Sequence, residues 1–452
     1  MNDGTKDRQQ KIVKVFNKLK AKLWRWKMTK HSGIELDSDG ILERCQWGII
    51  TKVDRAKIVE LVVRQGWRDP VVKIIGIAQV ETMNLLHEHT KVPSPEVIGY
   101  SATLDNEFGF PYIVMEELPG KSATDLWFEE HGEIPSAETE QKRLTFLRSL
   151  ARRMTELENF PFQTIGMPTY DNVAGPDFND IDPERTPVRK YYVWPFCDSY
   201  HAVERGPFAS TQAYIRHARD EEEQLVPRKN GKFDYNQLQQ LGMYKILDMV
   251  FAHPVFNSSP EDTFTLRHSD LDTQNILIND EGNITGILDW DGSISMPRCV
   301  GHASVPHFMD RDFYPDAAIK SLFLSWRANH YRSIYAAALV EAGNPDTKYT
   351  TKSHIYQAAF AALYEGGDKL DSVQRLLREV PGLQMENSHL LALVGKGCKV
   401  TEQMLKTEVW KVLEPEMPSD NLLKDLDLKL KDEVLQGCMH EFTALNSIAD
   451  VA

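Results

Sequence analysis

The stretch that decides the fold spans residues 267–290 and reads RHSDLDTQNILINDEGNITGILDW. It contains His268-x-Asp270, then Asn275 five residues later, and finally Asp289. Each of these residue types is common in ordinary turns. Together, in this order and at this spacing, they indicate a loop that directs several oxygen atoms to one point.

The spacer between the polar residues predicts a β-hairpin. The run 279–283 is rich in turn-forming residues, so we expect segments 276–278 and 284–288 to pair. Such a hairpin would return Asp289 to a position beside Asn275. Two oxygen ligands would then face a hard divalent cation such as Mg²⁺, which prefers a few protein oxygens together with phosphates and waters.

The residues before this stretch predict a small β-rich lobe with one helix. Alternating and β-branched patterns indicate short strands, and an amphipathic pattern indicates one helix between them. A Leu-Pro-Gly break at 118–120 then predicts a hinge. The expected strands are 47–53, 58–64, 96–100 and 112–116, and the expected helix is 79–89.

The chain after Gly120 is predicted to be mainly helical. Residues 158–235 are rich in Pro, Gly, Asp and aromatic residues, so we expect an ordered, irregular insertion. The aromatic cluster 191–196 within it would pack against the helical lobe or line an acceptor pocket. The expected helices cover 140–157, 237–252 and several segments of 315–450, with a short β segment at 264–268.

At the His268–Asp289 segment the chain resembles the phosphotransferase family of aminoglycoside phosphotransferases and choline kinases, and is most similar to its uncharacterised fungal members. Further matching pieces are VPSPEV at 92–97, YIVMEELPG at 112–120 and DWDGSISMP at 289–297. The resemblance covers about residues 40–320. It implies an α+β, protein-kinase-like bilobal fold. The expected parts are a basic N-terminal segment 1–35, an N-lobe 36–117, and a C-lobe 118–452 with catalytic loop 266–291 and insertion 158–235.

The resemblance also implies roles for individual residues. Asp270 would be the catalytic base or the carboxylate that orients the acceptor hydroxyl, and Asn275 and Asp289 would hold Mg²⁺. His268 would brace the loop through hydrogen bonds, without acting as an acid or base. The backbone of the hinge residues Glu116, Glu117 and Leu118 would meet the adenine of the nucleotide.

The residue that would hold the nucleotide phosphates from the N-lobe is open between two candidates. Arg64 fits the third-strand position best, and Lys73 is its rival. The acidic partner expected on the following helix falls on Gln79, with Glu81 two positions away. Since residues two apart lie on different faces of a helix, Glu81 is not a simple substitute.

The sequence departs from the family's HGDLHPGN pattern, because it reads HSDLDTQN. Ser269 replaces a glycine and Asp272 replaces the second histidine. Asp272 would be either a solvated loop carboxylate or a negative charge that favours a cationic or polyol acceptor. Downstream, His302 and His307 would lie near the end of the active-site region, and we expect surface or core histidines rather than ligands there.

The function that follows is an ATP- and magnesium-dependent phosphotransferase that acts on a hydroxyl of a small molecule. ATP versus GTP and the acceptor's identity stay open. The alternative is a pseudokinase, a nucleotide-binding or scaffold protein without turnover. A typical protein kinase is disfavoured, because neither a Gly-rich phosphate loop nor an Ala-Pro-Glu segment after Asp289 is present.

Net charge and composition indicate which partners and which compartment to expect. The net charge of −14 disfavours generic nucleic-acid binding. Five widely spaced cysteines and the lack of an apolar run of ~18 residues suit a cytoplasmic protein. The basic amphipathic segment 11–27 would pack on the core, make a weak contact with an anionic membrane surface, or serve as a targeting or partner helix. The oligomeric state stays open.

Overall fold

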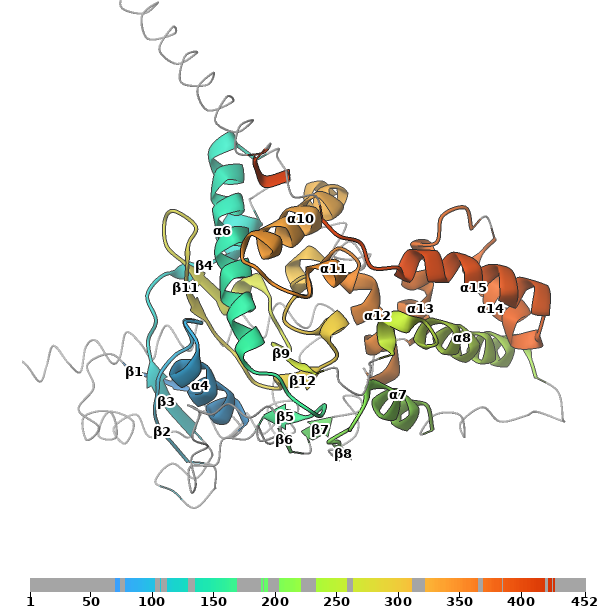
Figure 1. Cartoon of the computed structure of the whole chain (residues 1–452), viewed down its shortest axis with the longest axis horizontal. Coiled ribbons are helices and arrows are strands. Elements are labelled where there is room, and N and C mark those ends of the chain that lie inside the picture. Colours follow the sequence, from blue (N-terminus) through green and yellow to red (C-terminus); the bar gives the residue numbers. More distant parts are fainter. Residues whose placement is uncertain are drawn as a thin grey trace, which may run out of the picture. The chain divides into compact units, whose positions relative to one another are not determined.

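The computed structural model divides the chain into two compact units, and each is described by itself (Figure 1). One unit comprises residues 1–87 and 94–118, and the other comprises residues 88–93 and 119–452. The structure describes residues 70–73, 78–101, 106, 112–128, 135–168, 188–189, 191–193, 203–220, 233–257, 263–310, 322–364, 369–383, 385–418, 422–424 and 426.

The smaller unit contains a three-stranded antiparallel sheet and one helix. The central strand is β3, whose first four residues are buried, as its unbroken apolar sequence predicts. The helix and the strands expected at 96–100 and 112–116 are confirmed, whereas the expected strands 47–53 and 58–64 and the segment 11–27 lie outside the described residues. The elements are β1 (Pro70–Lys73), α4 (Ala78–His89), β2 (Val97–Ser101) and β3 (Tyr112–Glu116), in the sheet order β1-β3-β2.

The larger unit holds the predicted hairpin in a second three-stranded sheet. Strand β10 (Ile276–Ile278) pairs with β11 (Ile284–Ile287) on one side and with β4 (Lys121–Ser122) on the other. The chain reaches β4 through Gly120, whose φ of +116° favours glycine. A Cβ there would lie 2.8 Å from the Ile278 carbonyl oxygen, so glycine also permits the close approach to the hairpin.

Helix α6 (Ala137–Thr155) and helix α10 (Leu322–Glu341) lie beside each other (Figure 1). Each contributes one ring to an aromatic core around Trp127. Trp127 is central, with ring centroids 4.6 Å from Phe308 and 4.9 Å from Tyr331. The buried guanidinium of Arg143 donates to the Trp127 carbonyl at 2.9 Å and to the Tyr331 hydroxyl at 3.0 Å. A buried cation is tolerated because these acceptors and Glu140 satisfy it.

The described parts of the insertion 158–235 contain one helix that the sequence analysis does not predict. This helix is α7 (Thr211–Asp220), and it accompanies short strand pairs. The apolar residues of α7 recur at helical spacing, which favours an amphipathic helix. The remaining elements are α5 (Thr124–Trp127), η3 (Glu156–Asn159), β5 (Met167–Pro168), β6 (Val188–Arg189), β7 (Tyr191–Val193), β8 (Val203–Arg205), α8 (Tyr235–Phe251), η6 (Pro254–Phe256), β9 (Thr265–Arg267), η7 (Thr273–Asn275), β12 (Ile294–Met296), η8 (Arg298–Val300), η9 (His307–Met309), α11 (Thr347–Thr350), α12 (Ser353–Tyr364), α13 (Lys369–Arg378), α14 (Asn387–Lys396) and α15 (Lys399–Leu413).

Two glycines allow α8 and α14 to approach closely. A Cβ on Gly242 would lie 1.8 Å from the Leu391 carbonyl oxygen, and one on Gly395 would lie 1.9 Å from that of Leu238. Both distances are far below van der Waals contact, so only glycine fits at either position. Gly395 of the Gly395-Lys396-Gly397 segment therefore has a packing role.

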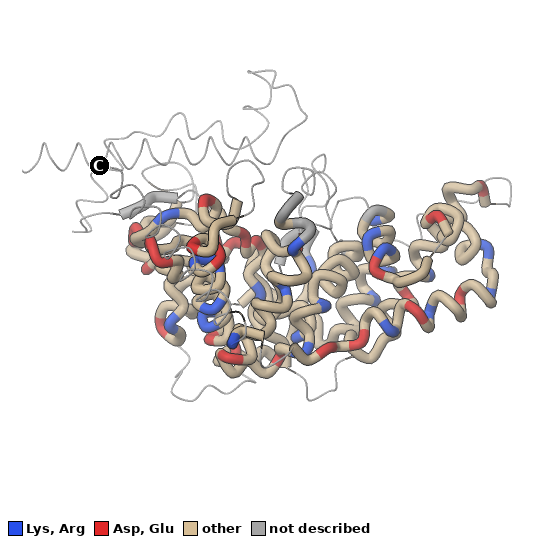
Figure 2. Tube along the Cα trace, turned by 90° about the horizontal axis from the view of Figure 1, so that it is seen from above, with Lys and Arg blue, Asp and Glu red and all other residues tan. Residues whose placement is uncertain are grey.

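Charged residues of both signs are interspersed along the described helices (Figure 2). Some join distant parts of the larger unit, such as Arg148 of α6 with Glu341 of α10 at 3.1 Å and Lys245 of α8 with Glu402 of α15 at 2.8 Å. Within the described part of the chain, no helix is both long and apolar enough to cross a membrane. The α+β fold class expected from the sequence, with a small sheet-containing unit and a larger helical one, is confirmed.

Candidate active site

The candidate site is built on residues 268–275, here called the HxD loop. Asn275 ends the single turn η7 and is 8% exposed. Its Nδ2 donates to the Asp270 carbonyl at 2.8 Å and lies 3.3 Å from Asp270 Oδ2. Because both neighbours are oxygens, the orientation of the amide is fixed. Its own oxygen is therefore the atom that remains for a cation.

The hairpin returns Asp289 beside Asn275, as its spacer predicts. The Leu288 N–H donates to the Asn275 carbonyl at 2.7 Å, which places the next residue, Asp289, alongside the HxD loop. Asp289 has a φ of +66°, a left-handed conformation that costs a non-glycine residue about 1–3 kcal/mol. Such conformations concentrate at functional sites, where the surrounding structure holds them in place.

His268 braces the loop in the way the sequence leads us to expect. Its Nδ1 accepts the Asp270 N–H at 3.1 Å, and its Nε2 contacts the Leu288 carbonyl at 2.9 Å. Together these contacts select the neutral tautomer with the proton on Nε2. Burial lowers the pKa of His268 to about 4, so the ring stays neutral at pH 7. The ring also packs on Trp290, with centroids 4.6 Å apart.

The two departures from the family pattern have structural roles. The Ser269 hydroxyl donates to the Asp291 carbonyl and ties the loop to the segment after the hairpin. Asp272 caps η7, because its Oδ1 accepts the Thr273 N–H at 2.7 Å. The expectation of a solvated Asp272 is wrong, since this residue is only 9% exposed. As a cap it gives no argument for a cationic acceptor.

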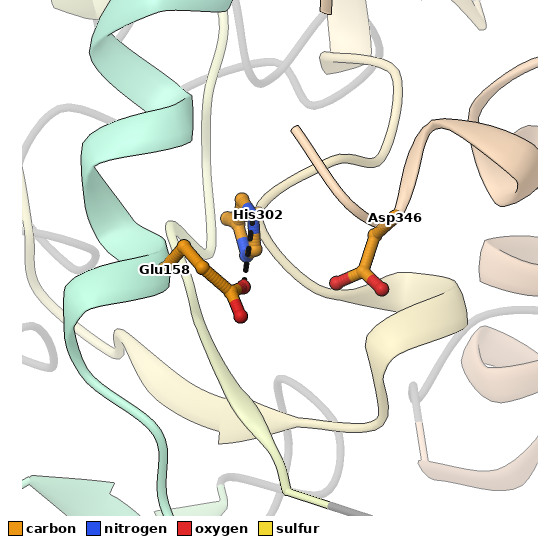
Figure 3. A group of neighbouring side chains, drawn as sticks. All are labelled: Glu158, His302 and Asp346. Carbon is orange, nitrogen blue, oxygen red and sulfur yellow. Dashed lines mark ion pairs between the residues drawn. The ribbon is translucent and has the colours of Figure 1, made fainter. Parts of the chain in front are cut away.

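A second group of ionisable residues, Glu158, His302 and Asp346, lies elsewhere in the larger unit (Figure 3). One ligand atom of each lies within 4.8 Å of the others, which suits a metal ion. However, Arg298 Nη1 donates to Glu158 at 2.9 Å and to Asp346 at 2.8 Å. The guanidinium thus supplies the positive charge that the carboxylates require. We assign the group a structural role that joins η3, η8 and α11.

Burial controls the ionisation of this group. The pKa of Asp346 is raised to about 6 by desolvation, against the opposing effect of Arg298. The pKa of His302 falls to about 3, because the ring is buried and lies near Arg298. His302 is a core histidine, as one of the two sequence expectations states.

The residues expected to bind nucleotide from the smaller unit are only partly described. Arg64 lies outside the described residues. Lys73 is the last residue of β1, and the structure describes its backbone but not its side chain. Glu81 lies in the first turn of α4 and is partly buried, while Gln79 is 1% exposed. Glu116 ends β3, and its N–H donates to the Glu96 carbonyl at 2.9 Å. Glu117 and Leu118 follow it, so all nucleotide-binding roles in this unit stay predictions.

Sequence reasoning expected His307 to be a surface or core histidine and did not predict its contact with the site. Its main chain and its ring both contact the HxD loop, although 36 residues separate it from Leu271. No local pattern marks such a contact.

A separate polar cavity of about 540 Å³ opens on the side of α6 near residues 283–284 and is lined by none of the predicted site residues.

The family model of the phosphotransferase enzyme family (APH) matches residues 77–300. This range includes α4, the hinge residues 116–118 and the whole HxD loop and hairpin. Over these residues the chain resembles the phosphotransferase enzyme family, as its motifs led us to expect.

Curated relatives come from fungi. A subtelomeric hrmA-associated cluster protein of Aspergillus fumigatus is 26% identical over 279 residues, which cover 52% of this chain and 53% of that protein. The clavilactone A biosynthesis cluster protein Y of Ampulloclitocybe clavipes is 24% identical over 265 residues, which cover 57% of this chain and 59% of that protein. The matches thus span little more than half the length of these relatives.

Solved structures of aminoglycoside phosphotransferases are also similar. A putative aminoglycoside phosphotransferase from Ralstonia eutropha is 13% identical, with a TM-score of 0.35, over 76% of this chain and 86% of that one. A thermostable mutant of aminoglycoside phosphotransferase APH(4)-Ia, in a ternary complex with AMP-PNP and hygromycin B, is 14% identical, with a TM-score of 0.33, over 76% of this chain and 84% of that one.

Proposed function

We propose that the protein is an ATP-dependent small-molecule kinase that transfers the γ-phosphoryl group to a hydroxyl of its acceptor. The observation that carries the proposal is the joint placement of Asp270, Asn275 and Asp289. The Asn275 amide holds Asp270 through its nitrogen, and the Leu288–Asn275 hydrogen bond brings Asp289 alongside. The match of residues 77–300 to a phosphotransferase family supports the same reaction.

Each of the three residues has a distinct role in this proposal. Asp270 accepts the hydrogen bond of the acceptor hydroxyl, turns its oxygen toward the phosphorus atom and takes its proton as the new O–P bond forms and ADP leaves. The Asn275 amide oxygen and the Asp289 carboxylate hold Mg²⁺, because hard oxygen donors suit this ion. Mg²⁺, when bound, neutralises charge on the phosphates. Positioning and charge neutralisation then supply most of the rate, as is general for phosphoryl transfer.

The setting that we propose is cytoplasmic. Cys299 and Cys398 are free thiols, which suits a reducing compartment. The partner that the proposal requires is a small molecule with a hydroxyl group. Its chemical class is the question that an acceptor screen would answer.

The proposal is tested with Asp270→Asn, which keeps the shape of the side chain and removes its negative charge. The matched control is Asp280→Asn, because Asp280 lies in the hairpin turn with its side chain 90% exposed. ATP consumption is measured against panels of amino alcohols, sugars and aminoglycosides. We expect Asp270→Asn to lower turnover about 10²–10⁴-fold, the usual contribution of a general base, while ATP binding persists. Turnover in Asp270→Asn equal to that of the control contradicts the role given to Asp270.

Binding of ATP without turnover in the wild type, against every acceptor and with water, would instead favour a nucleotide-binding protein that lacks activity.

A further inference from the structure

His307 binds the carbonyl groups of Ser269 and Leu271, the two residues that flank Asp270. Its main-chain N–H donates to the Leu271 carbonyl at 3.0 Å. Its ring Nε2 lies 3.2 Å from the Ser269 carbonyl oxygen. The carbonyls before and after Asp270 are therefore both bound by one residue, which limits rotation of the backbone between them.

The geometry of the His307 ring also defines its protonation. Nε2 faces the Ser269 carbonyl, and Nδ1 lies 3.4 Å from Asp310 Oδ2. Since both neighbours are acceptors, a ring with a proton on each nitrogen satisfies both. Burial alone would lower the pKa of His307, but the hydrogen bond and charge of Asp310 raise it to about 9. Ser269 therefore receives its hydrogen bond throughout the neutral range.

The element that carries His307 is fixed in the core of the larger unit. Phe308, 3% exposed, packs on Trp127 and on Phe146, whose ring centroids lie 4.6 and 5.6 Å away. The Met309 carbonyl accepts Arg332 Nη1 at 2.9 Å, and Arg332 is itself 2% exposed. The turn η9 is thus anchored directly beside the ring that contacts the loop. Because η9 is held in the core, its contacts can restrict the motion of the HxD loop.

We propose that His307, oriented by Asp310, is a positioning residue that sets the direction of the Asp270 carboxylate. The inference rests on the proposed function, because direction matters only if Asp270 meets an acceptor oxygen. His268 binds the N–H of Asp270, and His307 binds the carbonyls of the two flanking residues. Misplacement of a reacting group by about 1 Å can cost 10²-fold in rate, so loss of the brace should lower kcat more than it weakens nucleotide binding.

Two variants separate the hydrogen bond from the bulk of the ring. His307→Phe keeps a planar ring but lacks the Nε2 donor. His307→Gln keeps an amide N–H at a similar distance along the side chain and can still donate to the Ser269 carbonyl. His389→Phe is the matched control, because His389 lies on α14 with 66% of its side chain exposed.

The first readout is phosphate release from Mg-ATP with water as the acceptor, with kcat and KM for ATP determined separately. We expect His307→Phe to lower kcat about 10–100-fold, the range seen when outer residues that orient a site are lost, with KM for ATP within about twofold. His307→Gln should recover most of kcat. Wild-type kcat in His307→Phe, or equal losses in the Phe and Gln variants, would overturn the inference.

The second readout is hydrogen exchange of the loop amides in the full chain. The Asp270, Asp272 and Asn275 amides are all hydrogen-bonded within the loop. We expect faster exchange over 268–276 in His307→Phe than in the wild type and in the His389→Phe control. If exchange over 268–276 is the same in His307→Phe as in the wild type, His307 does not hold the loop, whatever the kcat of the variant. A wild type that neither binds nor hydrolyses Mg-ATP overturns the proposed function instead, and exchange then still decides whether the brace exists.

Discussion

The neutral, buried ring of His268 predicts that stability falls on acidification. In the folded state the pKa of His268 is about 4, because burial penalises the charged ring, whereas in the unfolded chain it is about 6.5. Since the folded value is the lower one, the stability that the neutral ring contributes is complete above pH 6.5. It is lost as the pH falls toward 4. At pH 5, about 1.5 units below the unfolded value, the loss is about 2 kcal/mol.

The assay is chemical unfolding at pH 7.5 and pH 5.0 for the wild type and for His268→Gln, which cannot titrate. The control is His389→Gln, at an exposed position. His302 should add a loss of similar size, and the raised pKa of Asp346 should offset part of it, so the decisive quantity is the difference between variants. We expect the pH-dependent loss to be about 2 kcal/mol smaller in His268→Gln than in the wild type and the control. Equal losses in all three proteins would refute the assigned ionisation of His268.

Three further predictions concern packing, capping and buried charge. Gly395→Ala should lower the free energy of unfolding by about 1–3 kcal/mol, because the new Cβ meets the Leu238 carbonyl of α8, and denaturant midpoints measure this loss. Asp272→Ala should cost about 1 kcal/mol by removing the cap of η7 while Asp272→Asn costs less, which thermal unfolding of both variants compares. Arg143→Met should cost about 3–5 kcal/mol, because it leaves the Glu140 carboxylate without its cation and the Trp127 carbonyl without its donor, and equal melting temperatures of the variant and the wild type would contradict this.

The features that short-range sequence patterns determine could be predicted. The spacing of Asn275 and Asp289 around a turn-rich run fixes the hairpin, because the pairing partners lie within about ten residues of each other. The brace by His268 follows from the same local geometry. Helices and strands with clear periodicity were likewise found within a few residues of their bounds.

The features that depend on distant contacts could not be predicted. His307 reaches the HxD loop only because the aromatic core anchors Phe308, and no spacing in the chain marks that contact. Gly395 shows its packing role only once α8 lies against it. Asp272 could have been recognised as a cap, since Asp followed by a short helical turn is a known signal. The roles of Arg64, Lys73 and Glu81 remain predictions.

The central claim, that the HxD loop and Asp289 form a magnesium-nucleotide site, is tested most directly by ligand-induced thermal stabilisation. ATP is added with and without Mg²⁺ to the wild type and to Asp289→Ala, with Asp280→Ala as the exposed control. Since a ligand that binds only the folded state raises its stability, we expect a magnesium-dependent shift in the wild type and the control. That shift should be lost in Asp289→Ala. No shift in the wild type, or an undiminished shift in Asp289→Ala, would contradict the account.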